Sequence, residues 1–285
     1  AINTARKCNA VSLLHGKETR KMWHIMWQGV PEEQVPITHI TNGVHVPTWI
    51  GYEFTRLFEK YLGEDWLKHQ DEIDFWKKVR DIPDAEIWEV HTNFKRRLVE
   101  VIMSRAQGRW ADGEVTAQQV VTMGALLNPQ VLTIGFARRF TEYKRPALIL
   151  QDIDRLKHII NNPWRPVQIV FAGKSHPADF SGKYLLHRIY NLAQDREFQG
   201  RIAFVEDYDM RMARYLTHGI DVWLNNPLRL QEASGTSGMK AGINGVLNLS
   251  VRDGWWDEGF NEANGWAIGE GPEGAYSPDQ DKRDA

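Results

Sequence analysis

Short apolar runs alternate with helical patterns along the second half of the chain. The apolar runs lie at residues 131–136, 167–172, 202–205, 222–224 and 246–251. The segments between them, at 145–160, 184–193, 210–216 and 236–242, show the spacing of helices. Strands that alternate with helices form βαβ units, so we predict an α/β fold with a doubly wound, Rossmann-like parallel sheet. In such a sheet, ligands bind beyond the carboxyl ends of the strands.

The first half of the chain shows helical patterns and a loop. Residues 1–40 and 51–80 both read as helical, and the loop between them is rich in proline and glycine. A stronger pattern starts at Pro83 and Asp84, where apolar residues recur at three- and four-residue spacing until Gly108. We therefore expect helices to precede the sheet.

Composition excludes several classes of partner. The 285 residues carry a net charge of -2, which argues against a broad basic surface for nucleic acid. No apolar run approaches the roughly 18 residues needed to cross a membrane, and residues 1–14 do not resemble a signal peptide. The single cysteine, Cys8, cannot form an internal disulfide, so a reduced, cytoplasmic setting is expected.

A loop of small residues precedes a lysine near the end of the predicted sheet. It reads Glu232-Ala-Ser-Gly-Thr-Ser-Gly-Met-Lys240. Backbone N–H groups in such a loop, with the hydroxyls of Ser234, Thr236 and Ser237, suit a phosphate group at the start of a helix. Lys240 would follow on the first turn of that helix, but the spacing is not that of a nucleotide P-loop. An ordinary turn with a surface lysine is the alternative.

A basic segment follows the first predicted strand. Arg138, Arg139, Lys144 and Arg145 lie within eight residues of one another. At the carboxyl edge of a sheet these cations suit an oxyanion such as phosphate, because Arg can bind it through two N–H groups and Lys as a point charge. A solvated run of charge is the alternative.

Both segments resemble motifs of the glycogen and α-glucan phosphorylases. The small-residue segment resembles the family's signature Glu-Ala-Ser-Gly-Thr-Gly-Asn-Met-Lys at seven of nine positions, departing at Ser237 and Gly238. The basic segment resembles the family's Lys-Arg-x-His-Glu-Tyr-Lys-Arg, with Thr141 in place of the histidine. Weaker matches occur in collinear order, so the resemblance spans roughly residues 5–254.

The resemblance implies a role for each matching residue. Lys240 would hold pyridoxal phosphate (PLP) as a Schiff base. The other cofactor-binding residues would be Thr236, Ser237, Arg138 and Tyr208. The residues that bind the glucosyl unit or the substrate phosphate would be Asn42, Ser234, Gly235, Glu232, Arg139 and Lys144, of which the last three would be catalytic.

The resemblance also implies the reaction and the architecture. The reaction is reversible phosphorolysis, in which orthophosphate releases a terminal α-1,4-linked glucose of an α-glucan as α-glucose 1-phosphate. The glucan would be glycogen, starch or maltodextrin. The fold is that of two-domain glycosyltransferases of the B type, and the assembly is a homodimer. Residues 1–42 would form the helical end of the first domain, and residues 43–285 a C-terminally incomplete PLP-binding domain.

Two alternatives stay open. Retaining glycosyltransferases that use a nucleotide sugar share this fold and often carry a Glu-x7-Glu pattern. Glu232 matches its first glutamate, but Lys240 stands at its second position and so favours PLP. The chain could also be a glucan-binding phosphorylase fragment without a working site. We predict no metal site, since His176 and His187 have no companion at metal-ligand spacing.

Overall fold

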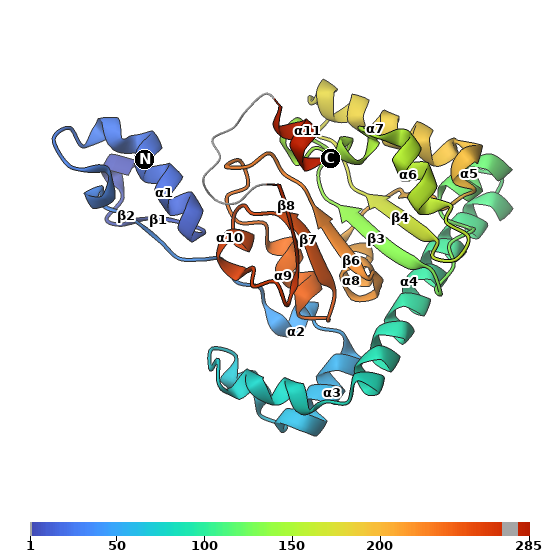
Figure 1. The fold of residues 1–285 in the computed structure, drawn as a ribbon, viewed down its shortest axis with the longest axis horizontal. Helices are drawn as coiled ribbons and strands as arrows, with labels where there is room; N and C mark the ends of the chain where they lie inside the picture. The colour runs from blue at the N-terminus through green and yellow to red at the C-terminus, as the bar shows by residue number, and fades with distance from the viewer. Residues whose placement is uncertain (1, 270–278) are drawn as a thin grey trace.

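A six-stranded parallel sheet organises most of the chain (Figure 1). The computed structural model describes residues 2–269 and 279–285. The strands are β3 (Leu132–Ala137), β4 (Val167–Ala172), β5 (Ile202–Val205), β6 (Val222–Asn225), β7 (Leu247–Val251) and β8 (Gly265–Ile268). They lie in the order β5-β4-β3-β6-β7-β8, and every neighbouring pair is parallel. This confirms the predicted doubly wound sheet, and it places the reversal of strand order between β3 and β6.

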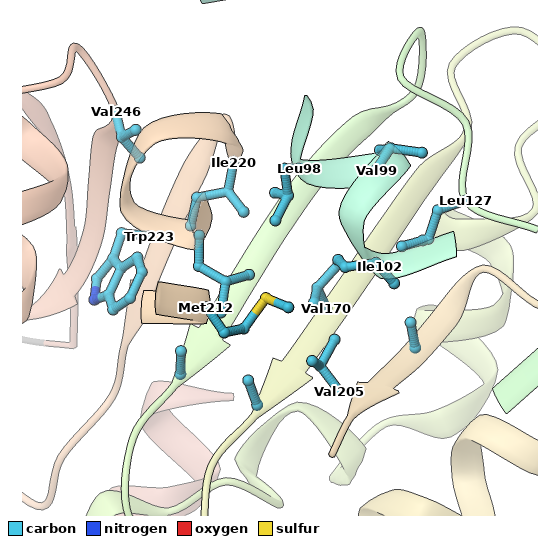
Figure 2. Packing of buried hydrophobic residues seen from close by; sticks show 14 of the residues in the cluster. Leu98, Val99, Ile102, Leu127, Val170, Val205, Met212, Ile220, Trp223 and Val246 are labelled. Carbon is cyan, nitrogen blue, oxygen red and sulfur yellow. The ribbon is translucent and has the colours of Figure 1, made fainter. Parts of the chain in front are cut away.

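Helices cover both faces of this sheet. On one face α4 (Asp84–Ala111), α8 (Met210–Gly219) and α9 (Thr236–Gly242) pack on the sheet, and on the other face α6 (Ile153–Ile160) and α7 (Phe180–Gln194) do so. The burial of β4 shows why both faces need cover, because every one of its residues is buried. Figure 2 shows Leu98 and Ile102 of α4 and Met212 of α8 pointing toward Val170 of β4.

The N-terminal segment forms a small unit beside the sheet (Figure 1). Strands β1 (Cys8–Ala10) and β2 (Ile37–His39) pair in parallel, and α1 (Leu13–Trp23) connects them together with two 3-10 turns, η2 (His24–Met26) and η3 (Glu32–Gln34). The prediction that residues 1–40 are helical is therefore wrong for these two strands. Strands of three residues are too short for their alternation to stand out in a sequence. The domain boundary at residue 42 stays a prediction.

Between this unit and the sheet lies a helical region. It holds α2 (Val46–Trp49), α3 (Tyr52–Leu62), η4 (Trp66–His69) and η5 (Phe75–Asp81) before α4. Residues 51–80 are thus only partly α-helical. The long helix starts at Asp84 as predicted but continues past Gly108, where a Cβ would meet no atom within 4 Å. A glycine in this open position does not end the helix.

The remaining helices are short. They are α5 (Ala117–Thr122), α10 (Trp256–Gly259) and α11 (Gln280–Asp284). The predicted helix at 145–160 is confirmed only for α6, since a 3-10 turn, η7 (Leu148–Leu150), comes before it. The tail from residue 269 to 285 is rich in Gly, Pro and Asp, a composition that predicts a loop or a frayed end, but α11 forms within it. Residues 270–278 lie outside the described residues.

Candidate functional site

The residues of the two motifs meet where the strand order reverses. Arg138 follows directly on β3, and the loop after β6 carries Glu232 toward α9. These two strands are neighbours in the sheet, so their carboxyl ends lie side by side. This is the position at which open α/β sheets bind ligands.

Glu232 lies between two cations. Its Oε2 atom accepts a hydrogen bond of 3.2 Å from Arg138 Nη1 and another from Lys144 Nζ. The three side chains are nearly buried, with exposed fractions of 10% for Glu232, 6% for Arg138 and 9% for Lys144. Burial and the nearby Arg138 charge lower the pKa of Lys144 to about 8. Two cations beside one carboxylate leave a net positive charge, which an anionic ligand would stabilise.

Arg138 also reaches the helix that follows the loop. Its Nη2 atom donates to Ser237 Oγ at 3.1 Å, while its buried Nε–H has no partner among the described residues. The buried hydroxyls of Ser234 and Thr141 also lack a partner in this part of the chain. Buried polar groups nearly always form hydrogen bonds, so the Arg138 Nε–H and the Ser234 hydroxyl are groups with which a polar ligand would bond.

Asp253, two residues after the end of β7, binds the backbone of the Glu232 loop. Its Oδ2 accepts from the Glu232 backbone N–H at 2.9 Å, and its Oδ1 accepts from the Gly254 N–H at 2.8 Å. Burial raises the pKa of Asp253 to about 6. Gly254 has a φ of 55°, and a Cβ there would lie 2.3 Å from Ser234 O. The loop and the turn after β7 therefore fit together only with glycine at this position.

Lys240 lies in the last turn of α9, not in the first turn as predicted. Its Nζ is 3.9 Å from the centre of the Trp49 ring, a cation–π contact. Burial lowers the pKa of this amine, and no hydrogen bond or ion pair reaches it from the described residues. Trp49 is fixed because Asn244 Nδ2 donates to its carbonyl at 2.8 Å while Asn244 Oδ1 accepts from Gly51 N at 2.7 Å.

Some predicted site residues lie apart from this cluster. Arg139 is exposed and its side chain bonds to Tyr143. Asn42 is exposed, and its backbone N–H donates to Val11 O at 3.0 Å. Tyr208 follows β5 and is half-buried, and burial raises its pKa to about 12 although the Arg138 charge acts in the opposite direction. The cluster proper thus contains Arg138, Lys144, Glu232 and Ser237, with Ser234, Gly235 and Thr236 in the same loop.

Arg145 does not serve the site, although its charge suggested that it would. Its Nε and Nη2 atoms donate to the carbonyls of Asn226 and Pro227 at 3.0 and 2.9 Å. Nη1 and Nη2 also bond to Asp281 and Asp284 of α11, at 2.8 and 2.6 Å. Arg145 thus joins the C-terminal helix to the loop after β6, and of the four cations of the basic segment only Arg138 and Lys144 bind Glu232.

Comparison with known proteins identifies the family. Residues 1–258 match the sequence model of the carbohydrate phosphorylases. The chain belongs to this phosphorylase family. It is 52% identical to a glycogen phosphorylase of Aquifex aeolicus over 95% of this chain and 39% of that protein. It is 48% identical to a maltodextrin phosphorylase of Thermococcus litoralis over 95% of this chain and 32% of that protein. It is 42% identical to a glycogen phosphorylase of Mycobacterium tuberculosis over 99% of this chain and 32% of that protein.

This phosphorylase chain therefore spans about a third of the length of its relatives. No helix in its described part is long and apolar enough to cross a membrane. The same residues contain no group of three or more His, Cys, Asp or Glu side chains that could hold a metal ion.

Sequence reasoning missed two supports of the phosphorylase site. The weaker matches to the family include Asp253-Gly254, after the last predicted strand, but nothing in that match showed that Asp253 binds the Glu232 backbone. They also include Asn244-Gly245, which continues the small-residue motif, yet the hydrogen bonds of Asn244 to Trp49 and Gly51 cross about 195 positions of the chain. The signals for both residues were the family match and a position after a strand or helix that carries a site residue.

Proposed function

We propose that this chain forms the cofactor-binding part of an α-glucan phosphorylase. In the proposed reaction, orthophosphate reversibly releases a terminal α-1,4-linked glucose as α-glucose 1-phosphate. The names of the relatives support the substrate class, since they include glycogen and maltodextrin phosphorylases. The observation that carries the proposal is the buried Arg138–Glu232–Lys144 cluster beside Ser237. It brings together cations for phosphate and a carboxylate for sugar hydroxyls.

The residues fit PLP at two points. Lys240 offers an amine whose pKa is lowered by burial, so a larger fraction is neutral and able to bond the cofactor's aldehyde. Arg138 and Ser237, already in contact, would bind the cofactor phosphate together with Thr236, and Arg138 Nε–H is a donor without a partner in the described chain. Tyr208 would lie near the ring. When bound, the cofactor supplies a phosphate group for acid–base work.

The cluster would also counter repulsion between two phosphate groups. Two unit charges about 4 Å apart near a protein surface repel by roughly 4 kcal/mol. Lys144 and Arg139 would bind the orthophosphate, and Arg138 would lie between the two groups. A bound anion raises the pKa of Lys144 from about 8, so this lysine would stay charged at neutral pH.

Glu232 would then orient the glucosyl unit. Its Oε1 atom is left for a sugar hydroxyl, because both cations bind Oε2. Ser234 and Gly235 would add donors from the same loop, and Asn42 would approach from the N-terminal unit. Ser12 links the two parts, since its hydroxyl donates to Ala233 O at 2.7 Å.

The cofactor assignment is tested by reduction. The chain is incubated with PLP, treated with borohydride and digested, and the cofactor is located by mass spectrometry. We expect near-ultraviolet absorbance and a label on the peptide that contains Lys240. Lys240→Ala should lose this label, whereas Lys183→Ala, on the exposed face of α7, should keep it. Equal labelling of wild type and Lys240→Ala would show that the cofactor assignment is wrong.

The reaction is tested with glucan and phosphate. We expect little turnover from this chain alone, because the proposed division assigns only residues 1–42 to the first domain and residues 43–285 to the second. The complete protein should form α-glucose 1-phosphate, and Glu232→Gln should reduce that activity more than it reduces PLP binding. Full activity of the chain alone would contradict the expectation that the site needs first-domain residues beyond residues 1–42.

The family resemblance also supports a homodimer in the cytoplasm. Sedimentation of the complete protein tests the assembly, with a mass of two chains expected. A monomer at micromolar concentration would contradict it.

A further inference from the structure

A cavity of about 420 Å³ lies away from the Glu232 cluster. It opens between α3, α4 and α8, and its charged lining residues are Glu53, Arg97, Arg211 and Arg214. None of them belongs to either motif of the phosphorylase site. Its walls are aromatic, with Phe94 and two tyrosines, Tyr52 and Tyr215.

The cavity carries an excess of positive charge. Glu53 Oε1 pairs with Arg97, so that guanidinium is compensated. No carboxylate among the described residues pairs with Arg211 or Arg214, which lie one turn apart on α8. His218 adds no charge at neutral pH, since burial lowers its pKa. Two uncompensated guanidinium groups match a phosphate dianion, to which each can donate two hydrogen bonds.

The cavity also holds a hydrogen-bond acceptor without a donor. Glu53 Oε2 is buried and has no partner in the described part of the chain. A buried carboxylate oxygen is costly unless it accepts a hydrogen bond, and a hydroxyl group is a suitable donor. Phe94 and Tyr215 add aromatic rings to the lining, and Arg211 Cζ lies 5.9 Å from the centre of the Tyr215 ring.

We propose that this cavity binds a small phosphorylated sugar. Arg211 and Arg214 bind its phosphate, and Glu53 accepts a hydrogen bond from one of its hydroxyls. The ligand would lie close to Trp49, because the cavity residue His218 has its Nε2 atom 2.9 Å from the carbonyl of Trp49. Trp49 in turn contacts Lys240. Binding at the cavity does not require that Lys240 hold PLP, so this proposal and the proposed function can fail independently.

The test uses ribose 5-phosphate, which is titrated into the chain without PLP and followed by calorimetry. Inorganic phosphate and ribose are titrated separately as the two halves of the probe. We expect ribose 5-phosphate to bind at least about tenfold more tightly than either half, since it engages both the two arginines and Glu53. The double variant Arg211→Ala/Arg214→Ala should lose at least about tenfold in affinity. A matched control is Arg188→Ala/Arg196→Ala, two exposed arginines outside the cavity, and it should bind like the wild type.

A second variant separates the sugar from the phosphate. Glu53→Gln should narrow the preference for ribose 5-phosphate over inorganic phosphate, because the acceptor for the hydroxyl is weakened. Circular dichroism confirms that each variant is folded. Three results would overturn the proposal: no binding of ribose 5-phosphate at millimolar concentration, unchanged binding by the arginine double variant, or equal affinity for ribose 5-phosphate and inorganic phosphate.

Discussion

Asp221 is a nearly buried carboxylate whose substitution should destabilise the fold strongly. It lies at the start of β6 and binds groups from two other elements: His91 and Lys95 of α4 and the backbone N–H of Thr133 in β3. The distances are 2.7 Å to His91 Nε2, 2.5 Å to Lys95 Nζ and 2.6 Å to Thr133 N. The side chains of His91, Lys95 and Asp221 are 9%, 8% and 11% exposed. The network therefore joins the long helix to the two central strands.

Asp221→Asn keeps the shape of the side chain but leaves Lys95 without a counter-charge. Breaking a buried ion pair from one side costs about 3–5 kcal/mol, which is a large part of a typical unfolding free energy of roughly 5–15 kcal/mol. Combining it with Lys95→Met removes the unpaired charge. The double variant should therefore be more stable than Asp221→Asn alone, with a coupling energy of about 1–3 kcal/mol.

The assay is urea denaturation at pH 7, followed by tryptophan fluorescence and far-ultraviolet circular dichroism. The control is Glu59→Gln, which breaks the exposed pair with Arg56, 66% exposed, and should cost less than about 0.5 kcal/mol. A loss below about 1 kcal/mol for Asp221→Asn would refute the reasoning. Purely additive losses for Asp221→Asn and Lys95→Met would do the same.

The pH dependence gives a further check on Asp221. Burial alone would raise its pKa, but the bonds from His91 and Lys95 outweigh burial and the pKa is lowered. A carboxyl with a lowered folded-state pKa stabilises the fold above its unfolded value, about 3.9, and this contribution is lost as the pH falls through the folded value. The advantage of the wild type over Asp221→Asn should therefore shrink below about pH 4.

Three further predictions concern the site. Gly173→Ala places a Cβ 2.0 Å from Arg138 O at a residue whose φ is 153°. It should lower the free energy of unfolding, measured by urea denaturation, by more than about 2 kcal/mol. The control Gly108→Ala should leave the free energy of unfolding unchanged or raise it. Asn244→Ala removes three hydrogen bonds, two of them buried, and should lower the free energy of unfolding by about 3 kcal/mol and the amount of PLP fixed by borohydride. Normal PLP labelling of this variant would contradict the prediction. Because the pKa of Asp253 is raised to about 6, its contribution to stability is complete below about pH 4 and falls by roughly 3 kcal/mol as the pH rises past 6. Asp253→Asn should abolish that fall, and an unchanged profile of unfolding free energy against pH would refute the assignment.

The sequence by itself determined the class of fold and the family. Buried strands appear as continuous apolar runs, so β4 was placed at residues 167–172, and α9 was placed at 236–242, both with their observed bounds. Chemistry-bearing motifs are local strings, so the loop from Glu232 to Lys240 and the basic segment from Arg138 could be found without the structure. The reversal of strand order followed only after the pairing of β3 with β6 was known.

Tertiary structure alone decided which charges meet. Glu232 and Arg138 are 94 positions apart, so no local pattern could show that they form a hydrogen bond. Arg145 and Lys144 are neighbours of equal charge, yet one is bound to two backbone carbonyls and to α11, and the other to Glu232. The physical reason is that a sequence pattern reports on neighbouring residues, whereas these contacts join distant ones. Periodicity reports whether a side chain is buried, whereas the partner of a buried charge depends on how distant segments pack.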